Sequence, residues 1–173
     1  MIEIRKLTED DSIEDLIKLS REFFKEYESY HDSFFKIGIL KNSDITNYFI
    51  KMIKSQDHVV YVTIIDKKII AYITCYIVNQ SVYWKVKRVG HISGLMVKKA
   101  CRGMGIAKRL LKKANQFFKE RGVDYFTVYT AIANEEGIEF YKRRGFEKLG
   151  LTMIAKVDSI SVKTKLLKDE KEE

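Results

Sequence analysis

One strand–helix–strand unit constrains the fold of this chain most. The run His91 to Val97 is strand-like, and apolar residues at helical spacing follow from Ile106 to about Arg121. Val123 to Tyr129 is then a second run typical of a buried strand. Two strands joined through a helix lie parallel in one sheet, because a tight hairpin cannot connect them. The sequence therefore predicts an α/β protein with a sheet that is parallel around this helix.

The turn between the first strand and the helix reads Arg102-Gly103-Met104-Gly105-Ile106-Ala107. Glycines let the backbone turn sharply and bring its N–H groups close to a ligand. At the positive end of a helix, such groups attract phosphate oxygens. Taken alone, a short Gly-x-Gly turn fits many phosphate ligands.

Hydrophobic periodicity and turn residues predict the other elements. They are a strand at Ile2–Arg5, helices at Ile13–Tyr27 (capped by Asp10, Asp11 or Ser12) and Ile45–Ile53, strands at His58–Ile65, Ile69–Val78 and Val89–Val97, a helix at Glu135–Arg144, and a hairpin from Phe146 to about Leu166. Gly122 is expected to end the central helix in the left-handed conformation. The segment Gln80 to Arg88 could extend two strands or form a loop. The order β-α-α-β-β-β-α-β-α-β-β predicts a mixed sheet of about seven strands flanked by about four helices.

A second motif lies downstream of the turn: Asn134, then Tyr141 seven residues later, then Gly145-Phe146. With Arg102, Gly105 and Ala107 at the fixed positions of a Gln/Arg-x-x-Gly-x-Gly/Ala loop, the chain resembles the GCN5-related N-acetyltransferase (GNAT) family. The resemblance covers about His91 to Leu149, and the earlier elements follow the same order. It implies the acyl-CoA N-acyltransferase fold.

The resemblance also implies a reaction: direct transfer of the acetyl group of acetyl-CoA to a primary amine. The acceptor would be a small amine or polyamine, or an amine of a protein or peptide. In the family, the loop holds the pyrophosphate and the pantetheine arm runs along the preceding strand, where a backbone N–H near Leu95 or Met96 could stabilise an oxyanion. The implied cofactor-binding residues are Leu95, Met96, Val97, Arg102, Gly103, Met104, Gly105, Ile106, Ala107, Lys108, Asn134 and Tyr141.

Two residues are candidates for proton transfer. By resemblance, Tyr141 is the general acid that donates to the coenzyme A sulfur, although a lone Tyr often only packs. No acidic residue occurs from Val82 to Val97, so His91 is the candidate base; its alternative is a His satisfied inside the sheet. Asn134 is equally suited to cap a helix. If the fold holds, Glu26, Glu28, Tyr30 and His31 would border the acceptor site.

Length, composition and cysteine count lead to expectations about domain number, cellular location and metal binding. The 173 residues suit a single domain at 1–167 with a charged tail at 168–173 that frays. The start lacks the apolar core of a signal peptide and no apolar run spans a bilayer, so we expect a cytoplasmic protein without a membrane partner. Cys75 and Cys101 have neither disulfide nor ligand spacing, and no metal site is expected. Pairing into a homodimer is left open.

Two other functions compete with acetyl transfer. One is a non-catalytic acyl-CoA-binding module, in which the loop is present without the acid and base. The other is nucleic-acid binding, which the net charge of +8 would suit. The chain has no helix-turn-helix or zinc signature, so we expect no nucleic-acid partner.

Overall fold

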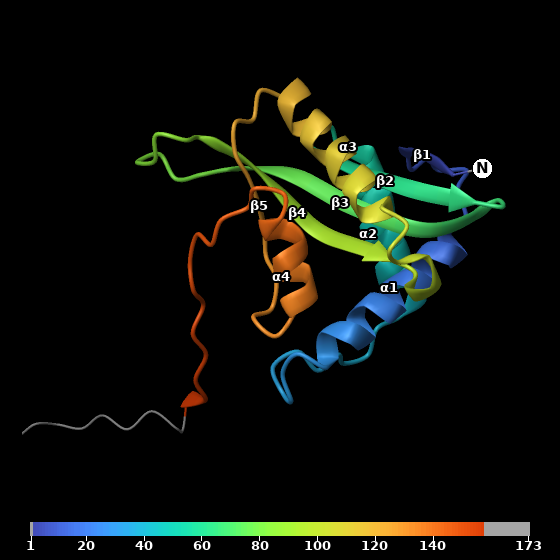
Figure 1. The fold of residues 1–173 in the computed structure, drawn as a ribbon, viewed down its shortest axis with the longest axis horizontal. Coiled ribbons are helices and arrows are strands. Elements are labelled where there is room, and N and C mark those ends of the chain that lie inside the picture. The colour runs from blue at the N-terminus through green and yellow to red at the C-terminus, as the bar shows by residue number, and fades with distance from the viewer. Residues whose placement is uncertain (1, 158–173) are drawn as a thin grey trace, which may run out of the picture. The chain divides into compact units, whose positions relative to one another are not determined.

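Five strands form one mixed sheet in the computed structural model, which describes residues 2–157 (Figure 1). They lie side by side in chain order: β1 (Glu3–Lys6), β2 (His58–Ile65), β3 (Lys68–Asn79), β4 (Arg88–Val97) and β5 (Phe126–Val128). β1 to β4 are antiparallel, and β5 is parallel to β4. The mixed sheet and its parallel pair confirm the predicted α/β architecture. The described residues hold five strands instead of about seven.

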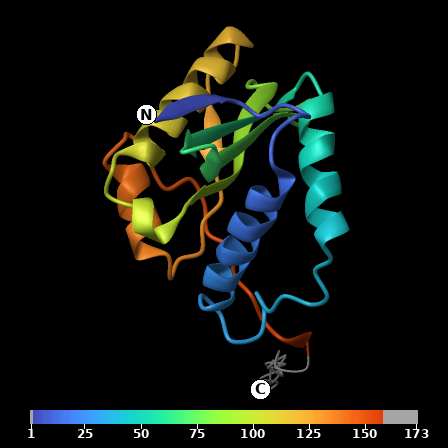
Figure 2. The same cartoon turned by 90° about the vertical axis from the view of Figure 1, so that its right-hand side faces the viewer.

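Helices cover both faces of this sheet (Figure 2). α1 (Ile13–Glu28) and α2 (Asn42–Lys54) lie on one face, and α3 (Ile106–Glu120) lies on the other. The core on the α1–α2 side includes Leu16, Leu19, Phe49, Val62 and Met96. α3 buries an apolar stripe of Ile106, Leu110, Leu111, Ala114, Phe117 and Phe118, as its periodicity predicts.

Local chemistry sets several of the element ends. The Ser12 hydroxyl accepts from the Asp15 N–H and caps α1. Asp66 and Lys67 have positive φ angles of 49° and 64°, which closes the β2–β3 hairpin with a tight turn. Gly122, at φ 65°, follows the end of α3 as predicted. α2 begins at Asn42, before the predicted Ile45, because the Asp44 carboxylate accepts from the Lys41 N–H at 2.9 Å.

Two segments differ from their predictions, and a third decides between two alternatives that the sequence left open. β5 is three residues long, whereas a strand over Val123 to Tyr129 was expected. Residues 146–157 contain no strand, so the final hairpin is wrong for this part, and the rest of it lies outside the described residues. Residues 80–87 form a loop closed by a hydrogen bond from Gln80 N–H to the Lys87 carbonyl. Apolar patterning alone overestimates strand length, because pairing also needs a neighbouring strand in register.

The last described helix, α4 (Glu135–Lys142), ends two residues before the predicted Arg144. Gly145 N–H donates to the Lys142 carbonyl, and Gly145 has a φ of 85°, which ends the helix.

The chain divides into two compact units, residues 1–138 and 139–173, and each is described by itself. A single domain over residues 1–167 stays a prediction, and the tail at 168–173 lies outside the described residues. None of the described helices combines the length and the apolar character needed to cross a membrane.

Candidate active site

β4 carries a bulge at its centre. Thr74 of β3 faces Gly94 and Cys75 faces Ile92, so Ser93 is the extra residue on β4. The Ser93 hydroxyl lies 2.8 Å from Thr74 Oγ1 and 3.0 Å from the hydroxyl of Tyr48 on α2. Side chains from three elements therefore hold this bulge. Our sequence reasoning missed it, although a Gly inside a strand is a known sign of a bulge.

Beyond the bulge, one edge of β4 has no strand beside it within residues 2–157. The last β4–β5 pair is Ile92 with Val128, whereas β4 continues to Val97. Backbone groups alternate sides along a strand, and Lys98 N–H donates towards β3, to the Ile70 carbonyl. The main-chain groups of Leu95 and Val97 therefore face the opposite side, past the end of β5. Those of Met96 face β3, and its side chain is buried in the core.

The predicted phosphate loop leads directly into α3. Gly103 and Gly105 have φ angles of 81° and 73°, which L side chains rarely adopt, and open space lies around both. The hydrogen bond from Arg109 N–H to the carbonyl of the N-cap residue Gly105 begins the helix, so the N–H groups of Ile106, Ala107 and Lys108 precede it. This turn of the helix has no acidic residue. The arrangement suits an anion.

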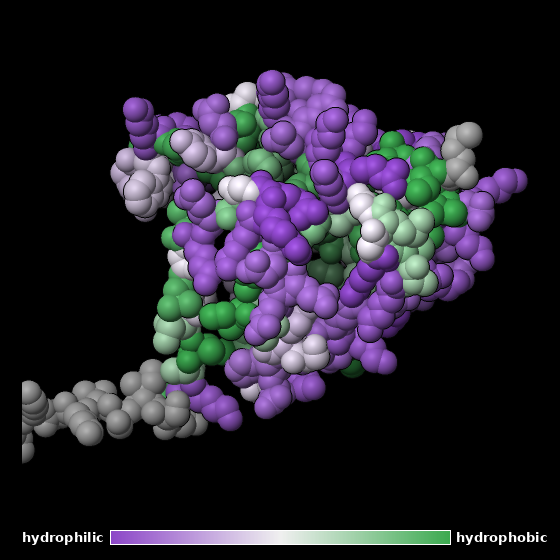
Figure 3. Space-filling model, in the orientation of Figure 1, coloured by the Kyte–Doolittle hydropathy of each residue, from purple (hydrophilic) through white to green (hydrophobic). Residues whose placement is uncertain are grey.

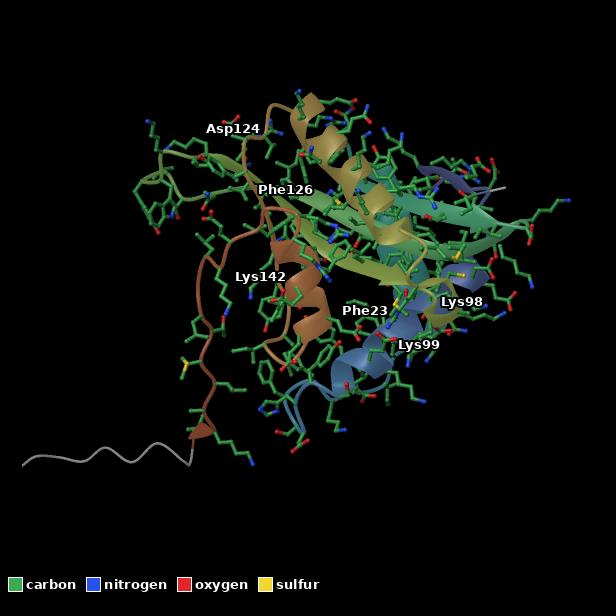
Figure 4. The ribbon with its side chains drawn as sticks, in the orientation of Figure 1. Phe23, Lys98, Lys99, Asp124, Phe126 and Lys142 are labelled. Carbon is green, nitrogen blue, oxygen red and sulfur yellow. The ribbon has the colours of Figure 1, made fainter. Side chains whose placement is uncertain are left out.

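Basic side chains surround this loop. Hydrophilic residues cover the exposed side of α3 (Figure 3), and they include Lys108, Arg109 and Lys112. Figure 4 labels Lys98 and Lys99 at the end of β4, near α1. The positive charges favour a phosphate-bearing ligand.

Arg102 supports the loop from within. Its Nε donates to the Val97 carbonyl at 3.1 Å, and one terminal nitrogen donates to the Glu26 carboxylate at 2.6 Å. Lys99 Nζ lies 3.9 Å from the same carboxylate. The guanidinium thus joins the loop to the end of β4 and to α1. Glu26 was expected at the acceptor site, and its pairing with the loop was not foreseen, because the two residues are far apart in sequence.

His91 lies on β4 before the bulge, half-buried among polar and aromatic neighbours. Its Nδ1 is 3.0 Å from Thr127 Oγ1 on β5, and its ring centroid is 5.0 Å from that of Tyr76 on β3. Burial lowers the pKa of His91 below its ordinary value of 6.5. At neutral pH the imidazole is therefore uncharged, as a base must be.

Asn134 caps α4. Its Oδ1 accepts from the Gly137 N–H at 3.1 Å, and its Nδ2 donates to Thr130 Oγ1 at 2.9 Å. A Cβ on Gly137 would lie 2.8 Å from Asn134 Cγ, so this folded-back cap requires glycine. The Asn134 side chain occupies the space beside Gly137 on this face of the helix.

Tyr141 belongs to the second unit. Its ring packs edge-on against Phe146, with centroids 5.2 Å apart, and against Phe140 at 5.1 Å. Its carbonyl accepts from the Phe146 N–H at 3.2 Å, which helps end α4. These contacts place Tyr141 in a local aromatic group, and the general-acid role stays a prediction.

Aromatic residues gather at the end of α1. Tyr27 contacts Phe23, Tyr30 and Phe35, with ring centroids between 5.2 and 5.3 Å away. Burial raises the pKa of the Tyr27 phenol, and the backbone N–H of Ala131 hydrogen-bonds to it. This contact joins α1 to the segment that follows β5. Glu28 and His31 accept backbone N–H groups of the next loop, from Ile37 and Phe34 respectively.

Residues 2–157 contain no group of three or more His, Cys, Asp or Glu side chains placed to hold a metal ion. Cys75 is buried, and burial raises the pKa of its thiol, which keeps it protonated.

The sequence profile of the acetyltransferase (GNAT) family matches residues 13–146. The chain therefore belongs to this family of acetyltransferases. The match spans all the described helices and the strands β2 to β5.

Known proteins agree with this class. The chain is 29% identical over 145 residues to an uncharacterized N-acetyltransferase of Methanocaldococcus jannaschii, covering 84% of this chain and 60% of the relative. A predicted acetyltransferase of Clostridium acetobutylicum, solved with acetyl-CoA, has a TM-score of 0.71 at 19% identity, over 90% and 96% of the two chains. An aminoglycoside N-acetyltransferase in complex with CoA has a TM-score of 0.73 at 14% identity, over 90% and 94%. The two solved structures show the shared fold.

Proposed function

We propose that this protein transfers the acetyl group of acetyl-CoA directly to a primary amine. The observation that carries the proposal is the loop from Gly103 to Gly105, at the start of α3, together with the open edge of β4. The loop offers N–H groups and positive charge to a pyrophosphate, and the strand edge offers main-chain groups to an extended amide chain. Acetyl-CoA has both of these parts.

Backbone groups would make most of the contacts to acetyl-CoA, and the Asn134 side chain would add one. The N–H groups from Gly103 to Lys108 would hold the pyrophosphate, with Met104 exposed beside them. Leu95 and Val97 would pair with the pantetheine arm, and the Leu95 N–H is the better placed donor to the thioester carbonyl, since Met96 faces β3. Asn134 uses one Nδ2 hydrogen on Thr130, which leaves its second hydrogen for the arm.

The reaction moves two protons. As the amine nitrogen bonds to the acetyl carbon, the amine gives a proton to His91, whose ring is neutral at pH 7. The C–S bond breaks, and the thiolate takes a proton from the Tyr141 hydroxyl. The acceptor is a primary amine of a small molecule, or of a protein or peptide.

The proposal is tested by calorimetric titration with acetyl-CoA, followed by thiol release against a panel of polyamines, aminoglycosides and peptide amines. We expect saturable binding and release of thiol with at least one amine. Binding without release from any amine would favour a non-catalytic acyl-CoA-binding module. Absence of saturable binding at micromolar protein would refute both functions.

The general acid has its own test. Tyr141→Phe keeps the ring and removes the hydroxyl, so turnover should fall about 100-fold while acetyl-CoA affinity is kept. Tyr125→Phe, at an exposed tyrosine ahead of β5, is the matched control. Full activity of Tyr141→Phe would remove this residue from the mechanism.

A further inference from the structure

Four side chains form a row across adjacent strands of the sheet. His58 on β2 faces Tyr76 on β3, Tyr76 faces His91 on β4, and His91 faces Thr127 on β5. The rings of His58 and Tyr76 are stacked, with centroids 5.6 Å apart, and Tyr76 packs on His91 at 5.0 Å. Ring packing thus restrains the imidazole plane of His91 on one side. Thr127 supplies a polar contact on the other.

The Thr127 hydroxyl has one hydrogen and two lone pairs, and it has two partners. It donates to the Gly90 carbonyl at 3.4 Å and lies 3.0 Å from His91 Nδ1. A carbonyl can only accept, so the Gly90 contact forms when the hydroxyl hydrogen points towards Gly90. In that arrangement the lone pair of Thr127 Oγ1 faces Nδ1, and Nδ1 carries the imidazole hydrogen.

The position of this hydrogen decides which His91 nitrogen can accept a proton. A neutral imidazole with hydrogen on Nδ1 keeps its free lone pair on Nε2. Among the described residues, the hydrogen bonds of the His91 ring are confined to Nδ1.

We propose that Thr127 is a positioning residue, which holds His91 as the Nδ1–H tautomer so that Nε2 takes the proton of the acceptor amine. The proposal rests on the proposed function through the role of His91 as base. Thr127 itself touches neither the amine nor the thioester. It fixes the tautomer and the ring orientation, as a partner on the far nitrogen does for a catalytic or metal-bound histidine.

The experiment combines nitrogen-15 NMR of the imidazoles with steady-state kinetics on three variants. Thr127→Val keeps the side-chain shape and removes the hydroxyl, and Thr127→Ser restores the hydroxyl. Thr46→Val is the matched control, because Thr46 is a partly buried threonine on α2, whereas the hydroxyl beside His91 Nδ1 is that of Thr127. Spectra are recorded above pH 7, where His91 is neutral.

We expect the Nδ1–H tautomer of His91 in the unmodified protein and a mixture of tautomers in Thr127→Val. The value of kcat/KM should fall about tenfold, roughly the free energy of one neutral hydrogen bond, with acetyl-CoA affinity unchanged. Thr127→Ser should recover both the tautomer and the rate, and Thr46→Val should alter neither.

Three results would overturn the proposal: an Nε2–H tautomer of His91 in the unmodified protein, a tautomer that Thr127→Val leaves unchanged, or a changed tautomer with an unchanged rate. Failure of the proposed function gives a different result from failure of the Thr127 proposal. The protein would then release no thiol with any amine, while the spectra would still report the His91 tautomer.

Discussion

The two halves of β4 differ in what they offer to a ligand. From Arg88 to Ile92 the strand has β3 on one side and, from Gly90, β5 on the other, so its backbone groups are used within the sheet. From Gly94 to Val97, β3 alone among the described strands pairs with it. The main-chain groups of Leu95 and the Val97 N–H face the other side, while the Val97 carbonyl accepts from Arg102. In the proposed reaction the paired half would act through a side chain, His91, and the open half through its main chain. The bulge at Ser93 separates them.

This division suits a transfer between two substrates. A main-chain edge recognises an extended amide chain and is indifferent to which side chains the strand carries. A partly buried side chain, in contrast, can be tuned by its surroundings, as burial does for the pKa of His91. Four substitutions test this division, in order of decreasing effect.

The largest effect is expected at the paired half. His91→Gln should lower turnover about 100-fold if this residue is the base. Because burial lowers the folded-state pKa, the neutral form prevails above pH 6.5, and activity and the stability contribution of His91 are lost as the pH falls through that lowered pKa. The acid limb of the kcat/KM profile should therefore lie below pH 6.5 and disappear in His91→Gln.

The control for this variant is His58→Gln, on the far side of Tyr76, which should keep the acid limb. A pH–rate profile of His91→Gln that matches the unmodified protein would dismiss His91 as the base.

The loop beside the open half comes second. Gly105→Val places a β-branched side chain at φ 73°, at a cost of roughly 2 kcal/mol, so the empty loop should leave this conformation. Binding must then restore it, and acetyl-CoA affinity should fall about 30-fold in calorimetry. Gly38→Val is the control, since Gly38 has open space and no positive φ. Equal affinity in both variants would show that the loop geometry is not needed for binding.

The third test is the packing of the paired half. A Cβ on Gly90 would lie 2.6 Å from Cδ1 and 2.8 Å from Cζ of Phe118, a fully buried ring of α3. Gly90→Ala should lower the free energy of unfolding by about 1.5 kcal/mol through overpacking, measured in urea. Gly38→Ala should leave the unfolding midpoint unchanged. An unchanged midpoint for Gly90→Ala would mean that Phe118 can move aside.

The smallest effect is expected at the bulge. Ser93→Ala removes the hydroxyl that contacts Thr74 and Tyr48, at a cost of about 1 kcal/mol in the free energy of unfolding. If the bulge positions the open edge, acetyl-CoA affinity should fall as well. Ser33→Ala, at an exposed serine, is the control. Lower stability with full affinity would separate the bulge from cofactor binding.

Local sequence was sufficient for the elements whose geometry depends on near neighbours. The α3 stripe and the left-handed Gly122 match their predictions. They are set by helical period and by residues that tolerate positive φ. The length of β5 was wrong, because a strand ends where its partner leaves, and the bulge on β4 lies immediately past Ile92.

The candidate site divides in the same way. The sequence by itself determined the family, the glycine-bearing loop and the identity of the residues around it, since these depend on spacing along the chain. Only the tertiary structure decided that Arg102 pairs with Glu26, that Leu95 faces the open edge and that Thr127 contacts His91. Each of these contacts joins groups distant in sequence or depends on strand pairing, and no local pattern encodes the register that brings them together.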